Sequence, residues 1–312
     1  MKLLFFGTPE EAVPFLEQCA RDHEVMAVVT RPDRPAGRGL EVQPPAVKVL
    51  AEKLQIRVFQ PERPSEITGA LRDLSADAAV VVAYGKLLKR DVLDSTRLGF
   101  LNVHFSLLPQ YRGAAPIEWA LMDGNKITGV TVFWLDEGMD TGPIQVASRT
   151  AIEDDDDAIT LKRRLIQLGL ETLSHALNEI SHGRVHQTPQ GQARTQSLAP
   201  KITRDHALVD FDRPAASLHH FVRGLAGGPR AYLKLPSGKS LAILKTRYES
   251  DAPETEKTPP GTVVVVDKTD GILIQCCPGR IWVVVVQPEG KRQIAAADFA
   301  NGLRLKPGDR LA

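Results

Sequence analysis

The chain has 312 residues, a net charge of +1, and 43% hydrophobic and 25% charged residues, the composition of a globular protein long enough for two domains. Its three cysteines, two of them adjacent, exclude a disulfide framework, and no His, Cys or Asp cluster has the spacing of metal ligands. The longest apolar runs are too short to span a bilayer, and the N-terminal residues lack the pattern of a signal peptide. We therefore expect a cytoplasmic protein with no metal and no membrane partner.

The first part of the chain alternates short apolar runs with helical patterns. The apolar runs predict buried strands at Lys2–Phe6, Val25–Val29, Ala78–Ala83, Phe100–His104 and Val130–Leu135. The helical patterns fall at Glu10–Arg21, Pro45–Leu54, Ile67–Leu74 and Leu161–Ile180. This alternation predicts a parallel, doubly wound, Rossmann-like α/β sheet, in which ligands bind beyond the carboxyl ends of the strands.

The second part has a different texture, and a segment rich in Gln, Thr, Gly and Pro separates it from the first. A helical pattern runs from Ala215 to Gly224. Five short apolar runs then stand between turn sequences, at Ala231–Leu235, Ser240–Tyr248, Gly261–Asp267, Ile272–Cys276 and Ile281–Gln287. Such spacing predicts a small OB-like β-barrel. We expect a first domain at 1–187, a linker at 188–206 and a second domain at 207–312.

The small net charge hides an asymmetry between the two parts. Residues 1–187 hold 21 Lys and Arg against 26 Asp and Glu, whereas residues 188–312 hold 18 against 12. A basic second part favours contact with a polyanion such as a nucleic acid. Chance is the competing interpretation, because a domain of this size often carries several net charges.

Two polar side chains on one predicted strand are the first candidates for chemistry. Asn102 and His104 stand two positions apart, so their side chains share one face of the strand near its carboxyl end. Buried polar groups need hydrogen-bond partners, and the pattern therefore fits either a satisfied structural pair or a reactive site. The spacing alone leaves both interpretations open.

Two loops near these residues carry further polar groups. Residues 106–116 combine small residues with Arg112 and lead into a helix near Ile117. Residues 136–143 follow the next predicted strand, and we expect them to bring three carboxylates to the same edge of the sheet. A turn with solvated acidic side chains is the alternative interpretation of the second loop.

A family resemblance rests on four of these segments: Asn102–His104, Ser106–Pro109, Tyr111–Gly113 and Asp136–Gly142. Together they resemble the signature of the 10-formyltetrahydrofolate-dependent formyltransferases. Within that superfamily, the resemblance to methionyl-tRNA formyltransferases covers nearly the whole chain and includes Phe6–Pro9, Arg31–Gly39 and Val82–Gly85. It implies a Rossmann-like formyltransferase domain followed by an OB-like tRNA-binding domain, and we expect the chain to act as a monomer.

The resemblance also implies roles for individual residues. The catalytic trio would be Asn102, His104 and Asp140. The folate would be bound by eight residues: Ser106, Leu107, Leu108, Pro109, Tyr84, Gly85, Leu88 and Asp136. The tRNA would be contacted by Arg34 and Arg38. The formyl donor would be 10-formyltetrahydrofolate, and the acceptor would be the α-amino group of methionine on initiator tRNA.

The residue types of the trio suit acyl transfer to a nitrogen atom. Negative charge develops on the formyl oxygen when a neutral amine attacks the formyl carbon. The Asn102 amide and a protonated His104 can donate hydrogen bonds to that oxygen. Asp140 would favour the charged form of His104 and orient its ring. This chemistry needs no covalent intermediate with the protein.

Three alternatives remain open at the level of sequence. A sugar-nucleotide N-formyltransferase performs the same chemistry on a small amine and needs neither a basic barrel nor the loop at 31–39. A formyltetrahydrofolate hydrolase shares the formyl donor. A tRNA-binding module with a degenerate catalytic domain would not need an intact trio.

Overall fold

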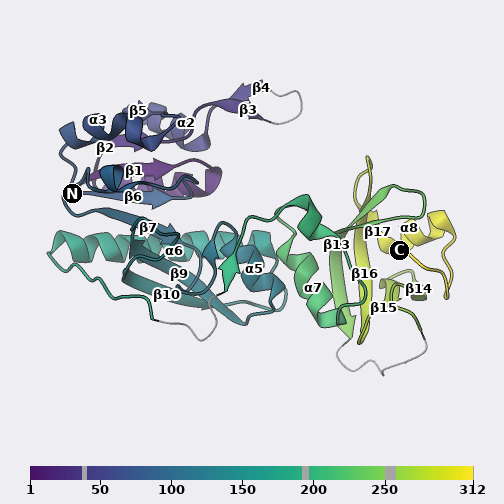
Figure 1. Ribbon diagram of the computed structural model, residues 1–312. Helices are drawn as coiled ribbons and strands as arrows, with labels where there is room; N and C mark the ends of the chain where they lie inside the picture. The colour runs from purple at the N-terminus through teal and green to yellow at the C-terminus, as the bar shows by residue number, and fades with distance from the viewer. Residues whose placement is uncertain (37–40, 192–196, 250–257, 312) are drawn as a thin grey trace. The chain divides into compact units, whose positions relative to one another are not determined.

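A seven-stranded sheet forms the centre of the N-terminal part of the computed structural model, which describes residues 1–36, 41–191, 197–249 and 258–311. The chain divides into two units (Figure 1). The first unit comprises residues 1–116, 128–151 and 163–199. The second comprises residues 117–127, 152–162 and 200–312.

The sheet of the first unit has the strand order β10-β9-β7-β6-β1-β2-β5. Its strands are β1 Lys2–Gly7, β2 Glu24–Val29, β5 Val58–Phe59, β6 Ala78–Val82, β7 Phe100–His104, β9 Ile127–Trp134 and β10 Ile144–Ala151. The strands from β5 to β7 are parallel neighbours. The expected Rossmann-like sheet is therefore confirmed for this half of the chain. Two further short pairs are β3 Arg34–Ala36 with β4 Glu41–Gln43, and β8 Arg112–Gly113 with β11 Leu198–Ala199.

Helices cover this sheet because their apolar residues recur on one face. They are α1 Val13–Asp22, α2 Ala46–Lys53, α3 Thr68–Asp73, α4 Arg90–Leu93 and α6 Ala158–Ser181, with short 3-10 turns η1 Glu10–Ala12 and η2 Pro64–Ile67. Helix α5 Pro116–Met122 belongs to the second unit from its second residue onward. A hydrogen bond connects helices α1 and α6: the Gln18 side chain donates to the Leu170 carbonyl. Among the described residues, no helix is long and apolar enough to cross a membrane.

Strand β9 differs from the sequence-based expectation in its direction. It runs antiparallel to β7, and its Trp134 pairs with Leu101 at the amino end of β7. The loop at 135–143 therefore starts at the opposite edge of the sheet from the carboxyl end of β7. Asp136 and Asp140 of this loop nevertheless line the same cavity as Asn102 and His104, so the loop folds back across the sheet to reach it.

The second unit is built on an antiparallel sheet with the order β12-β13-β16-β15-β14 (Figure 1). Its strands are β12 Tyr232–Lys234, β13 Ser240–Glu249, β14 Val263–Asp267, β15 Gly271–Gln275, β16 Arg280–Pro288 and the short β17 Ile294–Ala295, with η3 Arg204–Ala207, α7 Ala215–Gly224 and α8 Ala296–Leu303. The five expected strands and the helix at 215–224 are all present. Their apolar faces close a core of their own, which includes Leu218 of α7, Ile243 of β13 and Ile281 of β16.

A buried histidine should make the second unit sensitive to acid. His219 Nδ1 of α7 lies 3.0 Å from the Thr246 hydroxyl of β13. Burial, followed by the nearby positive charges of Arg223 and His220, lowers the pKa of His219 to about 4 from the ordinary 6.5. Because this pKa is depressed in the folded state, the unfolded chain binds more protons between these two values, and stability falls as the pH drops through that window.

Replacement of His219 by Gln should weaken this acid sensitivity. We expect the thermal midpoint of the wild type to fall more between pH 7 and pH 5 than that of His219→Gln. The difference should correspond to roughly one proton taken up on unfolding. Calorimetry at several pH values measures it, and parallel curves for the two proteins would show that His219 does not titrate on unfolding.

Candidate active site

A cavity of about 460 Å³ lies in the first unit where four segments of chain converge, one of which runs from Gly113 to Pro116. One wall is formed by residues that follow β6, including Tyr84, Gly85 and Leu88. A second wall is β7, through Asn102 and His104, and a third is the loop after β9, from Leu135 to Asp140. The fold thus gathers polar residues that lie far apart in the sequence.

Asn102 and His104 share the cavity-facing side of β7, as their spacing predicts. Asn102 pairs with Val81 and Phe133 through the sheet and is half-buried, whereas the His104 side chain is only 6% exposed. Among the described residues, the Asn102 side chain makes no hydrogen bond. Its amide lines the cavity with both of its N–H donors available to a bound molecule.

His104 lies between two acceptors. Its Nε2 lies 2.9 Å from the Tyr111 carbonyl, and its Nδ1 lies 3.7 Å from Asp140 Oδ2. A carbonyl can only accept, so Nε2 must carry a proton and donate it to Tyr111. The nitrogen that can gain or lose a proton is therefore Nδ1, on the Asp140 side of the ring.

The Asp140 carboxylate is held by the backbone of another loop. Gly113 N–H donates to Asp140 Oδ2 at 2.8 Å. Gly113 has a φ of +127°, and a Cβ at this position would lie 2.5 Å from the Ala199 carbonyl oxygen. Only glycine fits here, because both the positive φ and the close strand pairing exclude a side chain.

The charge state of His104 reflects opposing effects. Burial lowers the pKa of His104, while the charge of Asp140 and the hydrogen bond to Tyr111 act in the opposite direction. The effect of burial is the larger one, so the neutral ring predominates near neutral pH. A role as a charged donor would therefore require His104 to take up a proton against the cost of its buried setting.

The wall that follows β6 is fixed by an arginine. Arg31 Nε donates to the Tyr84 carbonyl at 3.2 Å, and its Nη2 donates to the Gly85 carbonyl. The Tyr84 ring packs edge-on against Phe6, and its hydroxyl is buried with no hydrogen-bond partner among the described residues. Burial raises the pKa of Tyr84 to about 12, so the phenol keeps its proton.

Comparison with known proteins decides what this site belongs to. Residues 1–177 match the formyl transferase family, and residues 201–304 match the C-terminal domain of formyl transferases. The methionyl-tRNA formyltransferase of Elusimicrobium minutum is 40% identical over 329 residues, which cover 99% of each chain. That of Geobacter metallireducens is 40% identical over 314 residues, which cover 100% of this chain and 98% of the relative. The chain belongs to the methionyl-tRNA formyltransferase family.

Solved structures share the fold at lower identity. The N-formyltransferase of Helicobacter canadensis, in complex with folinic acid and dTDP-3-aminofucose, superposes with a TM-score of 0.68. It is 18% identical, and the match covers 92% of this chain and 99% of that one. HypX of Aquifex aeolicus in complex with tetrahydrofolic acid gives 0.61 at 18% identity over 96% of this chain and 47% of that one. These likenesses show that the fold is that of formyltransferases.

As a member of this family, the chain is a formyltransferase, and its sequence-predicted site residues fall into three groups. The trio and four of the folate residues, Tyr84, Gly85, Leu88 and Asp136, line one cavity. The turn at 106–109 does not line it. That turn is instead built around Thr131 of β9, whose hydroxyl donates to the Ser106 carbonyl and accepts from Leu108 N–H.

The two arginines expected at the tRNA lie apart from the cavity lining or outside the described residues. Arg34 is on β3, exposed, with its Nη2 3.4 Å from Glu62 Oε2, a surface pair that contributes little to stability. Arg38 lies outside the described residues. Within the described part of the chain, no group of three or more His, Cys, Asp or Glu side chains could hold a metal ion.

Two kinds of site residue were not named singly from the sequence. Leu87 and Met139 were covered by the resemblance only as parts of the segments 82–88 and 136–140; they line the cavity and are 68% and 57% exposed, which is unusual for such large apolar side chains. Arg31 and Gln190 hold the backbone of the cavity wall through hydrogen bonds. An exposed apolar residue or a backbone-holding glutamine has no signature in a sequence pattern, because its role depends on what the fold brings beside it.

Proposed function

We propose that this enzyme transfers the formyl group of 10-formyltetrahydrofolate to the α-amino group of methionine on initiator tRNA, in the cytoplasm. One observation carries the chemistry: an unpartnered Asn102 amide lies in the same cavity as the His104–Asp140 pair. The choice of acceptor is supported by relatives named methionyl-tRNA formyltransferase that match over the full length of the chain.

The cavity residues fit a reaction in which charge develops on an oxygen. The donor supplies a formyl group on nitrogen; a bond forms from the acceptor nitrogen to the formyl carbon, the bond to the donor nitrogen breaks, and the donor nitrogen receives the proton lost by the acceptor. Asn102 donates a hydrogen bond to the formyl oxygen as its negative charge grows. His104 donates a second one from Nδ1 when that atom is protonated.

Asp140 has two functions in this proposal. Its charge stabilises the protonated form of His104, which burial opposes. Its carboxylate, fixed by Gly113 N–H, keeps the ring oriented and can hold a water molecule that carries the proton of the acceptor amine. Only the protonated fraction of His104 is active, so the rate should depend on pH.

The donor is proposed to lie against the wall after β6. The exposed side chains of Leu87 and Met139 offer apolar surface there to a flat heterocycle. Arg31 keeps this wall rigid through the Tyr84 and Gly85 carbonyls. The backbone of Ser106–Pro109 lies outside this lining and is held by Thr131 of β9.

The test is a choice of acceptors. Purified enzyme receives 10-formyltetrahydrofolate with initiator methionyl-tRNA, elongator methionyl-tRNA, an amino-sugar nucleotide, or no acceptor. We expect rapid formylation of the initiator tRNA alone. Formylation of the sugar nucleotide in its place would support the small-acceptor alternative, and equal donor consumption without acceptor would indicate a hydrolase.

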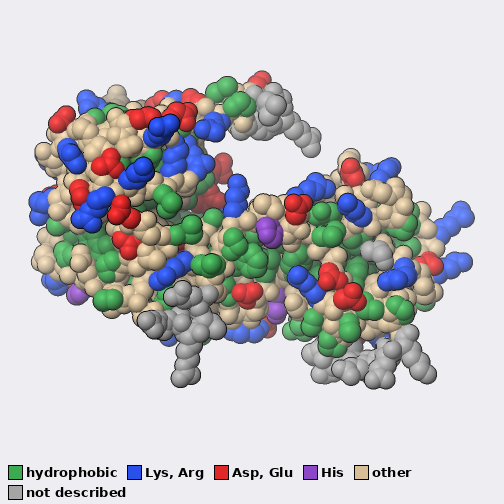
Figure 2. All heavy atoms as spheres, in the orientation of Figure 1, with side chains coloured by type: hydrophobic (Ala, Val, Ile, Leu, Met, Phe, Trp, Pro, Cys, Tyr) green, Lys and Arg blue, Asp and Glu red, His purple; other side chains and the backbone are tan. Residues whose placement is uncertain are grey.

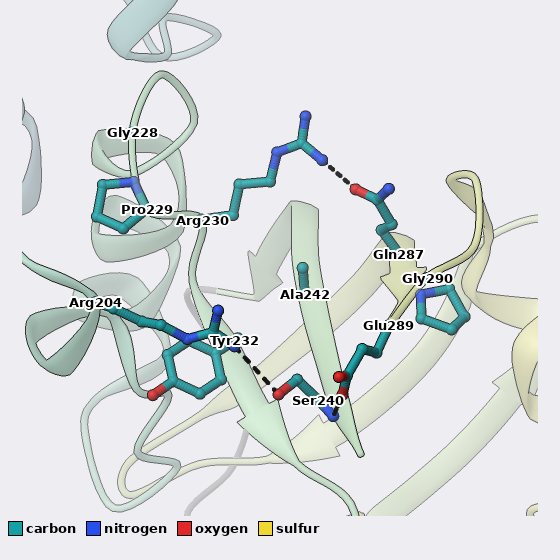
Figure 3. Close-up of a pocket in the computed structure, with 11 residues that line it drawn as sticks. Arg204, Gly228, Pro229, Arg230, Tyr232, Ser240, Ala242, Gln287, Glu289 and Gly290 are labelled. Atoms are coloured by element: carbon teal, nitrogen blue, oxygen red, sulfur yellow. Dashed lines mark hydrogen bonds between the residues drawn. The ribbon is translucent and has the colours of Figure 1, made fainter. Parts of the chain in front are cut away.

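A hollow on the second unit is the proposed contact for the tRNA. On the face shown in Figure 2, Lys and Arg side chains lie scattered over this unit with acidic ones between them, so net charge alone does not locate a binding site. The hollow has a volume of about 360 Å³. Figure 3 shows Arg204 beside the Tyr232 ring and Arg230 reaching toward Gln287.

The hollow combines a flat surface with guanidinium donors. The Arg204 guanidinium lies 4.9 Å from the centroid of the Tyr232 ring and donates to the Ser240 hydroxyl. Arg230 donates from Nη1 to Gln287 Oε1. Each arginine keeps further N–H groups for phosphate oxygens, and the Arg204 guanidinium that lies over the ring offers its own flat face to a base. Glu289 also lines the hollow and accepts from Ser240 N–H.

Replacement of Arg230 by Ala should therefore weaken the use of tRNA. We expect KM for methionyl-tRNA to rise about tenfold. The slope of the logarithm of the tRNA binding constant against the logarithm of the salt concentration should become shallower by about one, since one phosphate contact is lost. KM for the folate should not change. Lys268→Ala, at an exposed turn of the same unit that does not line the hollow, serves as the control. Identical salt slopes for both variants and the wild type would place the tRNA elsewhere.

A further inference from the structure

Gln190 is fully hydrogen-bonded although it lies in a segment without helix or strand. Its Nε2 donates to the Asp140 carbonyl at 2.9 Å and to the Gly142 carbonyl at 2.8 Å. Its Oε1 accepts from Arg112 Nε at 3.1 Å and from Arg112 Nη2 at 2.7 Å. The two N–H donors of the amide face two carbonyls and its oxygen faces two guanidinium donors, so the network itself fixes the orientation of the amide.

The residue that Gln190 holds is under backbone constraint. Asp140 has a φ of +54°, a left-handed conformation that is uncommon for residues other than glycine. It lies in the loop that must fold back from the amino end of β7 to reach His104. A loop in this position needs external hydrogen bonds to keep one conformation, and Gln190 provides two of them.

Both ends of Asp140 are tied to the same neighbouring loop. The carboxylate accepts from Gly113 N–H, and the carbonyl is connected through Gln190 to Arg112, the residue before Gly113. A shift of the Gln190 amide would therefore move the carboxylate relative to His104 Nδ1, which is 3.7 Å away. Interactions at that distance change steeply with small displacements.

We propose that Gln190, held by Arg112, is a positioning residue that fixes the Asp140 backbone so that its carboxylate stays beside His104. The expected effect of this residue on kcat rests on the proposed function. Gln190 does not line the cavity, so it acts through Asp140 and does not touch the substrates. The two N–H donors on Gln190 Nε2 hold the Asp140 backbone in place, and Arg112 sets the direction of these donors by binding the amide oxygen.

The decisive variant is Gln190→Glu. It keeps an acceptor for Arg112 and even adds a charge to that pair, but it replaces the donor group by an oxygen that faces two carbonyl oxygens. If Gln190 only anchors Arg112, this variant should be as active as the wild type. If it positions Asp140, we expect kcat to fall about 10- to 100-fold, the scale of a small displacement at a reacting site, with KM for both substrates little changed.

A spectroscopic measurement separates this inference from the proposed function. The pKa of His104, followed by NMR of the imidazole nitrogens, should fall in Gln190→Ala, which adds no charge near the ring, because Asp140 no longer supports the protonated ring. This holds whatever acceptor the enzyme uses. Gln187→Ala, an exposed glutamine in the same segment, should leave both kcat and the pKa unchanged.

A double-variant cycle completes the test. In an Asp140→Asn background, the further change Gln190→Ala should reduce kcat much less than it does in the wild type, because the group it positions is already lost. Thermal melting confirms that each variant is folded at the assay temperature. Wild-type kcat in folded Gln190→Glu, an unshifted His104 pKa in folded Gln190→Ala, or full additivity in the cycle would overturn the proposal.

Discussion

Replacement of Asn102 by Ala should lower kcat by about 10²–10³-fold, the scale for loss of one donor to a developing oxyanion. The Asn102 amide has no hydrogen-bond partner among the described residues, so its removal leaves no orphaned group in the protein. The stability of the fold and the KM for the folate should therefore be retained. Single-turnover rates with initiator methionyl-tRNA measure the effect on the chemical step.

Two further variants sharpen this result. Asn102→Asp keeps the shape of the side chain but removes the N–H donors, so it should lose at least as much activity as the alanine variant. Asn178→Ala, an exposed asparagine of α6, should behave as the wild type. If Asn102→Asp instead retains near-normal turnover, the amide does not donate to the formyl oxygen and the trio has to be reassigned.

His104→Ala is a less direct probe than the Asn102 variants. Its removal leaves the Tyr111 carbonyl without the Nε2 donor, and an unsatisfied buried group costs about 1–3 kcal/mol. Loss of turnover in this variant would combine a missing donor with a disturbed loop. The Asn102 variants separate these two effects because Asn102 has no such structural bond.

Much of the fold could be predicted from the sequence because buried strands are continuous apolar runs. Phe100–His104 was predicted with the bounds that the structure shows, and so was the helix Ala215–Gly224. Strand β10 escaped prediction since half of its eight residues are polar and only Gln145 is buried, so it has no continuous apolar run. Strand direction is also absent from such patterns, which is why the antiparallel course of β9 was not expected.

The candidate site was predictable only in part. The spacing of Asn102 and His104 placed both side chains on one face, and that holds in the cavity. The position of Asp140 followed from family resemblance, because it depends on a loop that returns across the sheet. Gln190 could not be found, and Arg112 was noted only as part of the loop at 106–116, since the roles of both arise from hydrogen bonds between segments that are 78 residues apart.

The protonation state of His104 that the structure favours differs from the one expected from the sequence, and this difference matters for the mechanism. The sequence suggested a protonated histidine beside an acid. In the structure, burial lowers the pKa of His104 more strongly than Asp140 raises it. Asp140 is thus best understood as the group that limits the cost of protonating a buried ring, and this leads to a specific expectation for its removal.

Replacement of Asp140 by Asn should lower kcat by about 10²-fold, the lower end of what a positioned acid–base group contributes. The asparagine oxygen can still accept from Gly113 N–H, so the loop should keep its conformation. The negative charge is lost, however, and the pKa of His104 should fall further. Folding and KM for the folate should remain close to those of the wild type.

The pH profile shows whether this is the cause of the lost activity. Activity needs a protonated His104 and a neutral acceptor amine. A plot of log kcat against pH should therefore show one break at the pKa of each group. In Asp140→Asn, the break that belongs to His104 should move to lower pH, while the break of the amine stays in place. Glu137→Gln, which removes a carboxylate from the same loop, should leave the His104 break where it is. An unchanged His104 break in folded Asp140→Asn would mean that Asp140 does not control this proton. The carboxylate would then serve the reaction only through the water molecule it holds.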